Sequence, residues 1–520
     1  MKIEEHSKDE VINLVVDTLK KNKQVLIFVN AKRSAEKVAL DIAHFLEKNF
    51  NRSNLNLDLN KLNELSNKLV SVLERPTVQC LKLEECSKFG VCFHHSGLLP
   101  EQKELIETSF REGILKVIVA TPTLAAGVDL PAFRVIIRDL KRYSRGRSVY
   151  IPIMEYMQQA GRAGRPKYDN VGEAIIVVSS VSEREKAIND YILGEPEDIY
   201  SKLAVEPVLR TFALSLIAGN FFNTEEDLIN FFNKTFWSHQ YKDVDKIRFL
   251  IKGIISELIE KGFLYIDNEF YYATSLGKRV SELYLDPLTA YDFVKALERV
   301  EQFDSFAILV LISKSLELRP LPSVYKKDID WVYELIQEIQ DSLLFDLPSE
   351  FDYDFEEFLK AVKFAKLLDD WINELDEEEI LEKYNVRPGE LRVKLELVDW
   401  LIYALIELAK VVNKVKLVND LFRLRMRLHY GAKEELIPLL KLKGIGKHRA
   451  RLLYSNGIKN LGDVKKVGFK KLKEIIGDKL AVKVLEQVNI TVEDELLSKE
   501  ETIGKLKRLS RSNQSSLNDF

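Results

Sequence analysis

Short runs of apolar residues alternate with amphipathic stretches between Glu10 and Val178. This alternation predicts a parallel β-sheet that helices cover on both faces. We expect strands at Val25–Val29, Val91–His94, Val117–Val119, Val135–Ile137 and Ala174–Val178. We expect helices at Asp9–Lys20, Ala35–Glu47, Glu101–Glu112 and Ile153–Ala160. Ligands of such sheets bind at the carboxyl ends of the strands, so we look for functional residues in the segments that follow the strands.

The hydrophobic pattern becomes mainly helical after residue 200, which indicates further domains. Residues 201–285 combine three helical stretches with two short strands around Asp267-Asn268, which is typical of a winged helix. That fold either reads a DNA groove or serves as a scaffold. Residues 286–412 predict a helical bundle, and residues 413–497 predict a further helical domain. Residues 498–520 are polar and serine-rich, so this tail is expected to be disordered.

Composition narrows the class of protein. The 520 residues are 46% hydrophobic, which suits several soluble domains. No apolar run approaches the roughly 20 residues of a membrane span, and no signal sequence follows Met1, so a cytoplasmic location is expected. The adjacent His94 and His95 would point to opposite faces of a strand, so no metal site is expected. The cysteines fit neither a disulfide framework nor a zinc site and are expected to be reduced and buried; they are Cys80, Cys86 and Cys92.

The segment Gln158–Arg165, QQAGRAGR, carries two arginines, Arg162 and Arg165, behind glycines. Guanidinium groups bind phosphate in a bidentate manner, so this pair suits a polyanion at the edge of the sheet. The sequence contains no phosphate-binding GxxxxGK[ST] loop, because Lys443–Lys447, KGIGK, continues without Ser or Thr. It also contains no acidic pair at the end of an apolar strand, where a magnesium site would be expected. These residues predict one half of an ATP-hydrolysing site.

Four blocks occur in a fixed order: FVNAKRS (28–34), FHHSGL (93–98), ATPTLAAGVDLP (120–131) and MEYMQQAGRAGRP (154–166). In this order they resemble the second RecA-like domain of superfamily 2 helicases of the Ski-like group, and within it the archaeal Hjm/HELQ type. The resemblance implies a RecA-like α/β domain at residues 1–200. It also implies an ATP-dependent DNA helicase that moves 3′ to 5′ and opens forked or stalled replication structures in repair and recombination. The first RecA-like domain is not recognised in this sequence, so the chain alone is expected to be inactive.

The resemblance assigns roles to single residues. Arg162 and Arg165 would neutralise charge on the transferring phosphoryl group, a role worth about 10³ to 10⁵ in rate. Gln158 would orient the nucleotide or water, and Gly127 and Asp129 would approach the nucleotide across the domain cleft. The implied cofactors are ATP and Mg²⁺, with the magnesium ligands expected on the first RecA-like domain. Three further side chains are implied to hold phosphates of the DNA strand: Ser34, His95 and Thr121.

The stretch Val135–Pro152, VIIRDLKRYSRGRSVYIP, predicts a strand, a basic tip and a returning strand. The basic residues of this hairpin are interleaved with Tyr143 and Tyr150, as in surfaces that stack on bases; they are Arg138, Lys141, Arg142, Arg145 and Arg147. In the helicases that the chain resembles, a hairpin at this place splits the duplex. Arg142, Tyr143 and Arg145 are therefore candidate DNA contacts. An ordinary exposed loop is the alternative.

The helix expected at Gly389–Val412 is apolar around most of its circumference, which indicates a central position. A polar stripe at helical spacing breaks this pattern and comprises Arg392, Glu396, Asp399, Tyr403, Glu407 and Lys410. Its position matches the ratchet helix of the family, which lines the single-strand channel, so Arg392 and the bordering Trp400 are implied to contact DNA. The stripe is half acidic, which departs from the family pattern. Trp400 is either a base-stacking residue or a core residue.

Residues 441–483 reverse the net charge of −4 of the whole chain, with 13 Lys or Arg against 3 Asp or Glu. Within this stretch, Gly444 and Gly446 separate two predicted helices, which is the helix-hairpin-helix pattern. Such a turn presents backbone amides at a helix N-terminus to a phosphate, whatever the DNA sequence. Basic side chains that would reinforce the contact are Lys447, Arg449 and Arg451. A plain helical turn is the alternative.

The last seven residues, QSSLNDF, space Gln514, Leu517 and Phe520 as in peptides that bind the sliding clamp. The usual second aromatic residue is absent, so a bare disordered terminus is equally open. The expected partners are single-stranded and forked DNA, a first RecA-like domain in cis or in trans, and the clamp as a further candidate, with no membrane. Two other functions stay open: a fragment of an RNA-remodelling Ski-like helicase, and a non-enzymatic DNA-binding adaptor.

Overall fold

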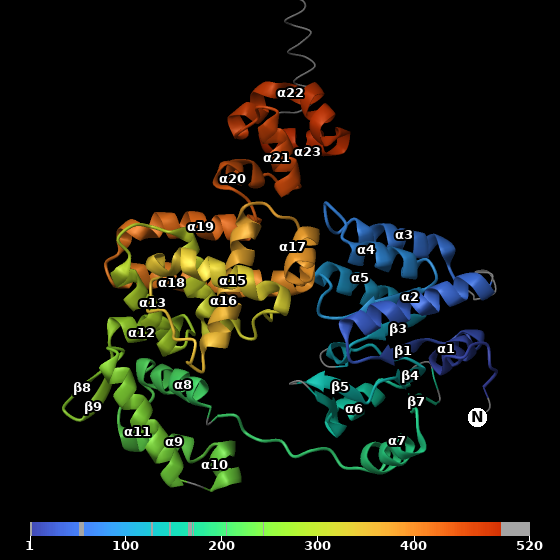
Figure 1. Cartoon of the computed structure of the whole chain (residues 1–520), viewed down its shortest axis with the longest axis horizontal. Coiled ribbons are helices and arrows are strands. Elements are labelled where there is room, and N and C mark those ends of the chain that lie inside the picture. Colours follow the sequence, from blue (N-terminus) through green and yellow to red (C-terminus); the bar gives the residue numbers. More distant parts are fainter. Residues whose placement is uncertain are drawn as a thin grey trace, which may run out of the picture. The chain divides into compact units, whose positions relative to one another are not determined.

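The computed structural model describes residues 3–50, 57–125, 128–144, 147–164, 169, 171–203, 205–242 and 244–489 (Figure 1). The chain divides into two compact units. The first comprises Met1–Leu209, Asn223–Ile254 and Asp376–Glu396, and the second comprises Arg210–Phe222, Ile255–Leu375 and Leu397–Phe520. In the described part of the chain, no helix combines the length and the apolar character that crossing a membrane requires.

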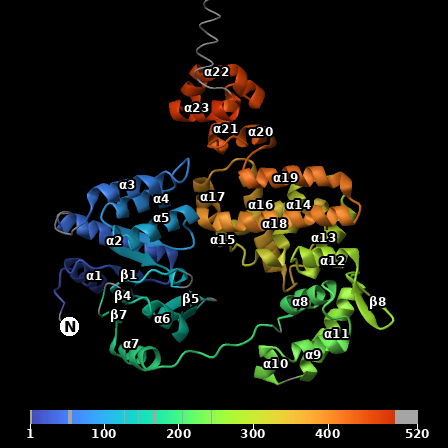
Figure 2. The same cartoon turned by 180° about the vertical axis from the view of Figure 1, so that it is seen from behind.

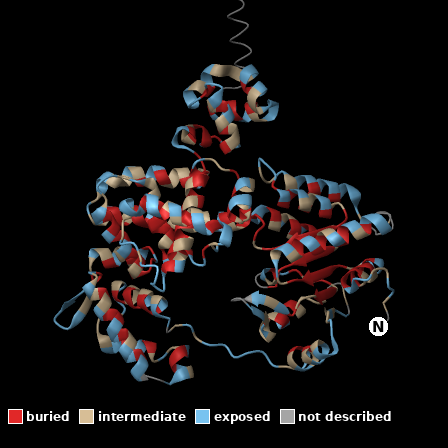
Figure 3. Cartoon of the chain, viewed as in Figure 1, coloured by how far each residue is buried: buried red, intermediate tan, exposed pale blue. Residues whose placement is uncertain are grey.

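A five-stranded parallel sheet forms the centre of the first unit (Figure 2). Its strands run in the order β2 (Val91–His94), β3 (Val117–Ala120), β1 (Val25–Phe28), β4 (Arg134–Ile137) and β7 (Glu173–Ile176). The first four strands are buried along their whole length, and the edge strand β7 is partly exposed (Figure 3). Continuous runs of Val, Ile and Phe suit strands that are covered on both faces. All five predicted strands are confirmed, with ends that shift by one or two residues.

The four predicted helices correspond to α1 (Glu10–Lys20), α2 (Lys32–Asn49), α5 (Pro100–Arg111) and α6 (Ile153–Ala160). Helix α2 lies against β2 and β3, and α6 lies against β4. The sequence analysis missed α3 (Leu59–Val70) and α4 (Val78–Ser87), which pack on each other. Their start signals are present, because the side chains of Asp58 and Thr77 accept hydrogen bonds from helix amides.

The three cysteines are free and buried, as predicted, and burial raises the pKa of the Cys86 and Cys92 thiols.

Two antiparallel hairpins were predicted, and both are confirmed. The first follows β4 and pairs β5 (Lys141–Ser144) with β6 (Arg147–Tyr150). The second, in the second unit, pairs β8 (Leu264–Asp267) with β9 (Phe270–Ala273). Its two turn residues, Asn268 and Glu269, both have positive φ, which matches the twist that a two-residue hairpin turn requires.

The remaining elements are helical. Those of the first unit are α7 (Val181–Lys186), α9 (Glu225–Phe232), α10 (Phe236–Tyr241) and α17 (Glu377–Tyr384). Those of the second unit are α12 (Ser275–Glu282), α13 (Pro287–Arg299), α14 (Ser305–Lys314), α15 (Lys326–Ile339), α16 (Phe355–Ile372), α19 (Val418–Tyr430), α20 (Ile437–Leu440), α21 (Lys447–Ser455), α22 (Leu461–Ile476) and α23 (Asp478–Gln487). Three helices have residues in both units: α8 (Glu206–Ala218), α11 (Val244–Glu260) and α18 (Pro388–Val411). Buried residues between 432 and 488 form a core of their own. The winged helix and the domain boundaries stay predictions.

Arg134, the first residue of β4, is fully buried and joins three elements of the first unit. Its guanidinium donates to Asp17 Oδ2, to Leu14 O and to Thr18 Oγ1 of α1, each at 2.7 Å. Its Nε donates to Glu173 Oε2 of β7 at 2.8 Å. A buried charge is tolerated where it is paired and hydrogen-bonded. Arg134 therefore fixes α1 and β7 onto β4.

Replacing Arg134 by methionine should destabilise the first unit by about 3 kcal/mol, because the change leaves Asp17 and Glu173 without their shared partner. The readout is native-state hydrogen exchange of the β4 amides, which reports the opening free energy of this unit alone. The matched control is Arg111→Met on α5, which removes an exposed ion pair to Glu107 and should stay within about 0.5 kcal/mol. Equal opening free energies in the two variants would contradict the structural role of Arg134.

Candidate functional site

Three of the four candidate segments leave the sheet along one edge. The register aligns Phe28 of β1 with Ala120 of β3 and with Ile137 of β4, and it aligns His94 of β2 with the same Ala120. All of these pairs are parallel, so each segment starts at the carboxyl end of its strand. The prediction of a shared edge is confirmed for the segments after β1, β2 and β3. It is wrong for QQAGRAGR, because Arg162 and Gly164 pair with Ala132, two residues before β4 begins, at the amino end of the sheet.

The segments after β3 and around the end of α6 are joined directly. Arg162 donates through Nε and a terminal nitrogen to Ala125 O, at 3.2 and 2.6 Å. Its other terminal nitrogen lies 3.6 Å from Asp129 Oδ1, and the Asp129 side chain is 94% exposed. Two backbone bonds reinforce the junction, from Ala132 N to Arg162 O at 2.9 Å and from Gly164 N to Ala132 O at 2.7 Å. The structure therefore brings the predicted catalytic Arg162 next to the predicted nucleotide contact Asp129.

Helix α6 presents two adjacent glutamines in different ways. Gln158, the predicted nucleotide contact, is exposed. Gln159 is buried, and its amide has no hydrogen-bond partner among the described residues. Of the two side-chain amides, that of the exposed Gln158 is therefore the one that a ligand can reach.

The hairpin β5–β6 is braced at its base by the segment that follows β1. The Asn30 side chain donates to Asp139 O at 2.8 Å and to Lys141 O at 2.6 Å, and the Asn30 N–H donates to Asp139 Oδ2 at 3.2 Å. On β5, Arg142 donates to Glu155 Oε2 of α6 at 2.7 Å. The sequence analysis assigned Arg142 to DNA, whereas the structure ties it to the helix that carries Gln158.

The two hairpin tyrosines differ in exposure. Tyr143 is 78% exposed and is free to stack on a base. Tyr150 is half-buried, with the ammonium groups of Lys141 and Lys186 over its ring at 4.7 and 4.8 Å. Of the interleaved aromatic residues, Tyr143 alone presents an open ring in the described part of the hairpin.

Three side chains were predicted to hold DNA phosphates, and the structure buries two of them, Thr121 and His95. Ser34 is half-buried at the start of α2, where its Oγ accepts from Arg138 at 3.4 Å. Thr121 is buried, and its hydroxyl lies 3.0 Å from that of Thr123. The His95 side chain is 0% exposed and cannot reach a phosphate, so the prediction for it is wrong. The alternation of β2 places His94 toward Glu107, at 3.0 Å, and His95 toward Glu36.

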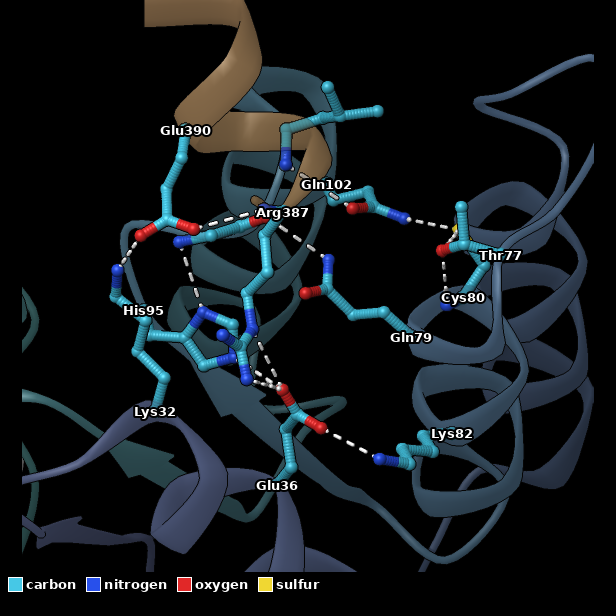
Figure 4. Close-up of polar contacts among 12 residues, drawn as sticks. Lys32, Glu36, Thr77, Gln79, Cys80, Lys82, His95, Gln102, Arg387 and Glu390 are labelled. Carbon is cyan, nitrogen blue, oxygen red and sulfur yellow. Dashed lines mark hydrogen bonds and ion pairs between the residues drawn. The ribbon is translucent and has the colours of Figure 1, made fainter. Parts of the chain in front are cut away.

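The carboxylate of Glu36 on α2 lies next to His95, with Lys82 and Arg387 also close to it (Figure 4). The Gly97 N–H donates to His95 Nδ1 at 3.1 Å, so the proton of the neutral ring sits on Nε2, 3.4 Å from Glu36 Oε1. That approach is within ion-pair range but lacks hydrogen-bond geometry. Burial lowers the pKa of His95 despite the nearby carboxylate, so the ring is neutral. Burial alone would raise the pKa of Glu36, but His95, Lys82 and Arg387 outweigh it and hold the pKa at about 2.

The polar stripe of α18 is confirmed, because its six residues are exposed or half-buried on a largely buried helix. Arg392 is exposed and lies 3.5 Å from Glu396. Trp400 is half-buried, and its indole N–H donates to Leu283 O at 3.1 Å, so one edge of the ring has a structural role.

Two of the three acidic residues of the stripe are paired with arginines that the sequence analysis missed. Arg425 of α19 forms a bidentate pair with Asp399, at 2.8 and 2.7 Å, and lies over the Tyr403 ring at 5.1 Å. Arg279 of α12 donates to Glu407 at 2.6 Å. The segment FRLRMRL, residues 422–428, alternates arginine and apolar residues. This local pattern does not predict which arginine pairs with an acidic residue of α18.

The basic helical region contains two turns rather than one. Gly444, with φ 88°, and Gly446 form the predicted turn before α21. A second non-helical glycine, Gly468 with φ 74°, divides α22. The surrounding exposed lysines are Lys443, Lys459, Lys465, Lys466, Lys470, Lys471, Lys473, Lys479 and Lys483. The segment VKKVGFKKL, with its central glycine, was the available signal for the second turn.

Two of the three basic side chains assigned to the first turn are engaged inside the protein. Lys447 is buried, donates to Leu375 O at 2.6 Å and lies 4.0 Å from the centre of the Trp371 ring. Arg451 pairs with Glu374 and Glu435. Arg449 is half-buried and donates to Gly444 O at 3.2 Å. Lys447 and Arg451 therefore hold the region in place. The assignment of the buried Lys447 to DNA is corrected, and that of the partly exposed Arg451 stays a prediction.

Six predicted site residues lie outside the described residues. They are Gly127, Arg145, Arg165, Gln514, Leu517 and Phe520. Their roles stay predictions.

Three family models match the chain. "Helicase conserved C-terminal domain" matches residues 59–167, which include the segments at the sheet edge after β2 and β3 and the hairpin. "Archaeal helicase, domain 4" matches residues 306–431, which include α18. "SAM-like Helix-hairpin-helix tandem" matches residues 436–489, in agreement with the two turns found there.

Curated relatives match nearly the whole chain. A protein named ATP-dependent DNA helicase Hel308 from Pyrococcus horikoshii is 41% identical over 479 residues, which cover 91% of this chain and 65% of that protein. Proteins of the same name from Methanococcus vannielii and Caldivirga maquilingensis are 39% and 36% identical, covering 95% and 94% of this chain and 69% and 66% of those proteins. The chain thus spans about 65% of the length of the Pyrococcus relative.

Replacing Glu36 by glutamine should destabilise the protein by about 3 kcal/mol at neutral pH, since a pKa held at about 2 instead of the ordinary 4.5 favours the folded state by that amount. A lowered carboxyl pKa stabilises the fold above the unfolded value, and this contribution is lost as the pH falls from about 4.5 to about 2. Urea unfolding followed by circular dichroism at pH 7 and pH 3 should therefore show the deficit of the variant shrinking in acid.

The control for this comparison is Glu47→Gln, an exposed position on the same helix, which should show no such pH-dependent deficit. A deficit of Glu36→Gln that is the same at both pH values would contradict the assignment of Glu36 as a paired, buried carboxylate.

Proposed function

Because the chain belongs to the Hel308 family of archaeal superfamily 2 DNA helicases, we propose that it is the C-terminal part of an ATP-driven DNA helicase of the Hjm/HELQ type. Its α/β domain is the second RecA-like domain of the motor. A first RecA-like domain supplies the P-loop and the magnesium ligands. The relatives carry about a third of their length outside the match, which leaves room for such a domain.

The observation that carries this proposal is the placement of Arg162. Its side chain is fixed to Ala125 O, in the segment that follows β3, and lies next to the exposed Asp129. A guanidinium held in this way can be presented to the phosphates of a nucleotide on a facing domain, where it stabilises charge in the transition state. Arg165 and Gln158 complete the contact in the proposal, and ATP with Mg²⁺ supplies the phosphoryl group.

The hairpin β5–β6 is proposed to separate the strands of a duplex. Tyr143 is its exposed aromatic residue, and the basic residues of the tip meet the phosphates. The hairpin is attached to the nucleotide-sensing helix α6 through Arg142 and Glu155, which supports a link between nucleotide chemistry and strand opening. The motion is 3′ to 5′, on forked or stalled replication structures in repair and recombination.

The remaining domains are proposed to hold DNA and to brace the motor. Residues 201–285 form a winged helix that acts mainly as a scaffold. Helix α18 lines the single-strand path through Arg392 and Trp400. The tandem helix-hairpin-helix region holds backbone phosphates through the turns at Gly444 and Gly468 and the lysines around them. The protein works in the cytoplasm, and QSSLNDF docks on the sliding clamp.

The chain alone should not hydrolyse ATP, because Arg162 needs a P-loop on a facing domain. Addition of the N-terminal part of the Pyrococcus horikoshii relative that this chain does not match should restore turnover that single-stranded DNA stimulates. In that mixture Arg162→Ala should lower the rate by about 10³-fold or more. The control Arg184→Ala, an exposed position on α7, should leave it unchanged. Turnover by the isolated chain would overturn the proposed division of the site.

DNA binding should depend on salt through the lysines near Gly468. Replacing the exposed Lys465 and Lys466 by glutamine should reduce the slope of log K against log salt by about 1 to 2, since each phosphate contact contributes about 0.9 on duplex DNA. The control Lys48→Gln, exposed on α2, should leave the slope as in the wild type. The measurement is a fluorescence titration of duplex and single-stranded DNA at several salt concentrations. Identical slopes in all three proteins would place the phosphate contacts elsewhere.

A further inference from the structure

The loop that follows β2, residues 95–99, and the start of α18 approach each other backbone to backbone within the first unit. Gly389 N–H donates to Gly97 O at 3.0 Å, and Gln79 Nε2 donates to the same oxygen at 3.2 Å. A Cβ at Gly389 would lie 2.1 Å from Leu98 O, whereas real Cβ atoms stay at least 3.0 Å from such an atom. Glycine is therefore the residue that permits this contact.

Two ion pairs flank the backbone contact (Figure 4). Arg387 donates through Nε and a terminal nitrogen to Glu36 Oε1, at 3.2 and 3.0 Å, and Lys82 donates to the other oxygen of Glu36 at 2.8 Å. Lys32 at the start of α2 pairs with Glu390. The second oxygen of Glu390 accepts from the Arg387 N–H at 3.0 Å, which satisfies an amide at the beginning of α18. Side chains of α2 thus hold the start of α18, and Lys82 of α4 supports Glu36.

The position of these groups separates them from ordinary core packing. Lys32 lies in the segment FVNAKRS, and Gly97 in FHHSGL, two of the segments at the functional edge of the sheet. Removing one partner of a buried charge pair leaves an uncompensated charge, so the arrangement has one strongly preferred geometry. Helix α18 is continuous over 24 residues, about 36 Å at 1.5 Å per residue, and its residues up to Glu396 belong to the first unit.

We propose that Glu36 and Arg387, with the close contact of Gly97 and Gly389, form a clamp that fixes the start of α18 to the α/β domain. Glu36 and Arg387 are positioning residues: movement of the domain during the nucleotide cycle is passed through the clamp to α18. This step rests on the proposed helicase function. The clamp itself is a property of the chain and can be tested without ATP.

Hydrogen exchange of the chain alone tests the clamp. Glu36→Gln and Gly389→Ala should each accelerate exchange of the amides in residues 387–396 at least tenfold, because each removes a different part of the clamp. The control Gly253→Ala, where no atom lies within 4 Å of the added Cβ, should leave exchange in this segment unchanged. Arg387→Lys should exchange more slowly than Arg387→Gln, since lysine keeps the charge but loses the bidentate fork. Wild-type exchange in Glu36→Gln and Gly389→Ala would overturn the clamp.

The second experiment tests transmission, in the mixture with the N-terminal part of the Pyrococcus horikoshii relative. The readouts are DNA-stimulated ATP hydrolysis and base pairs opened per ATP. Glu36→Gln should keep hydrolysis within about twofold of the wild type but open at least fivefold fewer base pairs per ATP. A parallel loss of both, as a merely structural defect would give, or an unchanged ratio would overturn the positioning role.

The two hypotheses fail in different ways. A wild-type mixture without DNA-stimulated hydrolysis rejects the proposed function, and the exchange experiment then decides on the clamp by itself. Gly389→Ala provides the second variant if Glu36→Gln does not fold, because it changes no charge and lies outside the nucleotide-facing segments.

Discussion

The parallel pairing of β1 with β3 on one side and with β4 on the other is the constraint on which the functional edge depends. It places Phe28, Ala120 and Ile137 in one row, so the chain leaves the sheet three times along the same edge. A slip by one residue would move a segment by about 3.3 Å and turn its side chains to the opposite face. Arg134, buried at the other end of β4, secures this register against α1 and β7.

The hairpin β5–β6 is held by two sets of contacts of different strength, one to α6 and one to the segment after β1. Arg142–Glu155 is a partly exposed ion pair, worth about 1 kcal/mol or less. Asn30 makes three hydrogen bonds to the base of the hairpin, each worth about 1 kcal/mol. The base of the hairpin is therefore held more firmly to β1 than its strand β5 is held to α6. A small displacement of α6 can tilt the hairpin without detaching it from the sheet.

The sequence predicted whatever is encoded locally. The five strands, α6 and both hairpins follow from periodicity and from turn residues, and the edge follows from the rule for parallel sheets. Partner choice over long separations was not predictable. Glu36 and Arg387 lie 351 positions apart, so nothing near His95 announced that its surroundings would be used for α18. The internal partners of Lys447 and Arg451 were not predictable for the same reason, because they lie on residues 374, 375 and 435. The placement of Arg162 beside Asp129 did not follow from the strand rule, because the Arg162 backbone pairs with Ala132 ahead of β4, away from the carboxyl ends of the strands.

A chain with a net charge of −4 can still have a basic surface at residues 441–483, because several arginines pair with carboxylates while the lysines there are exposed. Arg387, Arg425 and Arg451 each bind a carboxylate, with planar groups whose fork fits it. The exposed basic residues of the helix-hairpin-helix region are instead lysines. A lysine is a hydrated point charge that attracts phosphate without fixing its orientation. These arginines therefore pair with acidic residues of the fold, and the exposed lysines of residues 441–483 leave a basic surface for the proposed phosphate contacts.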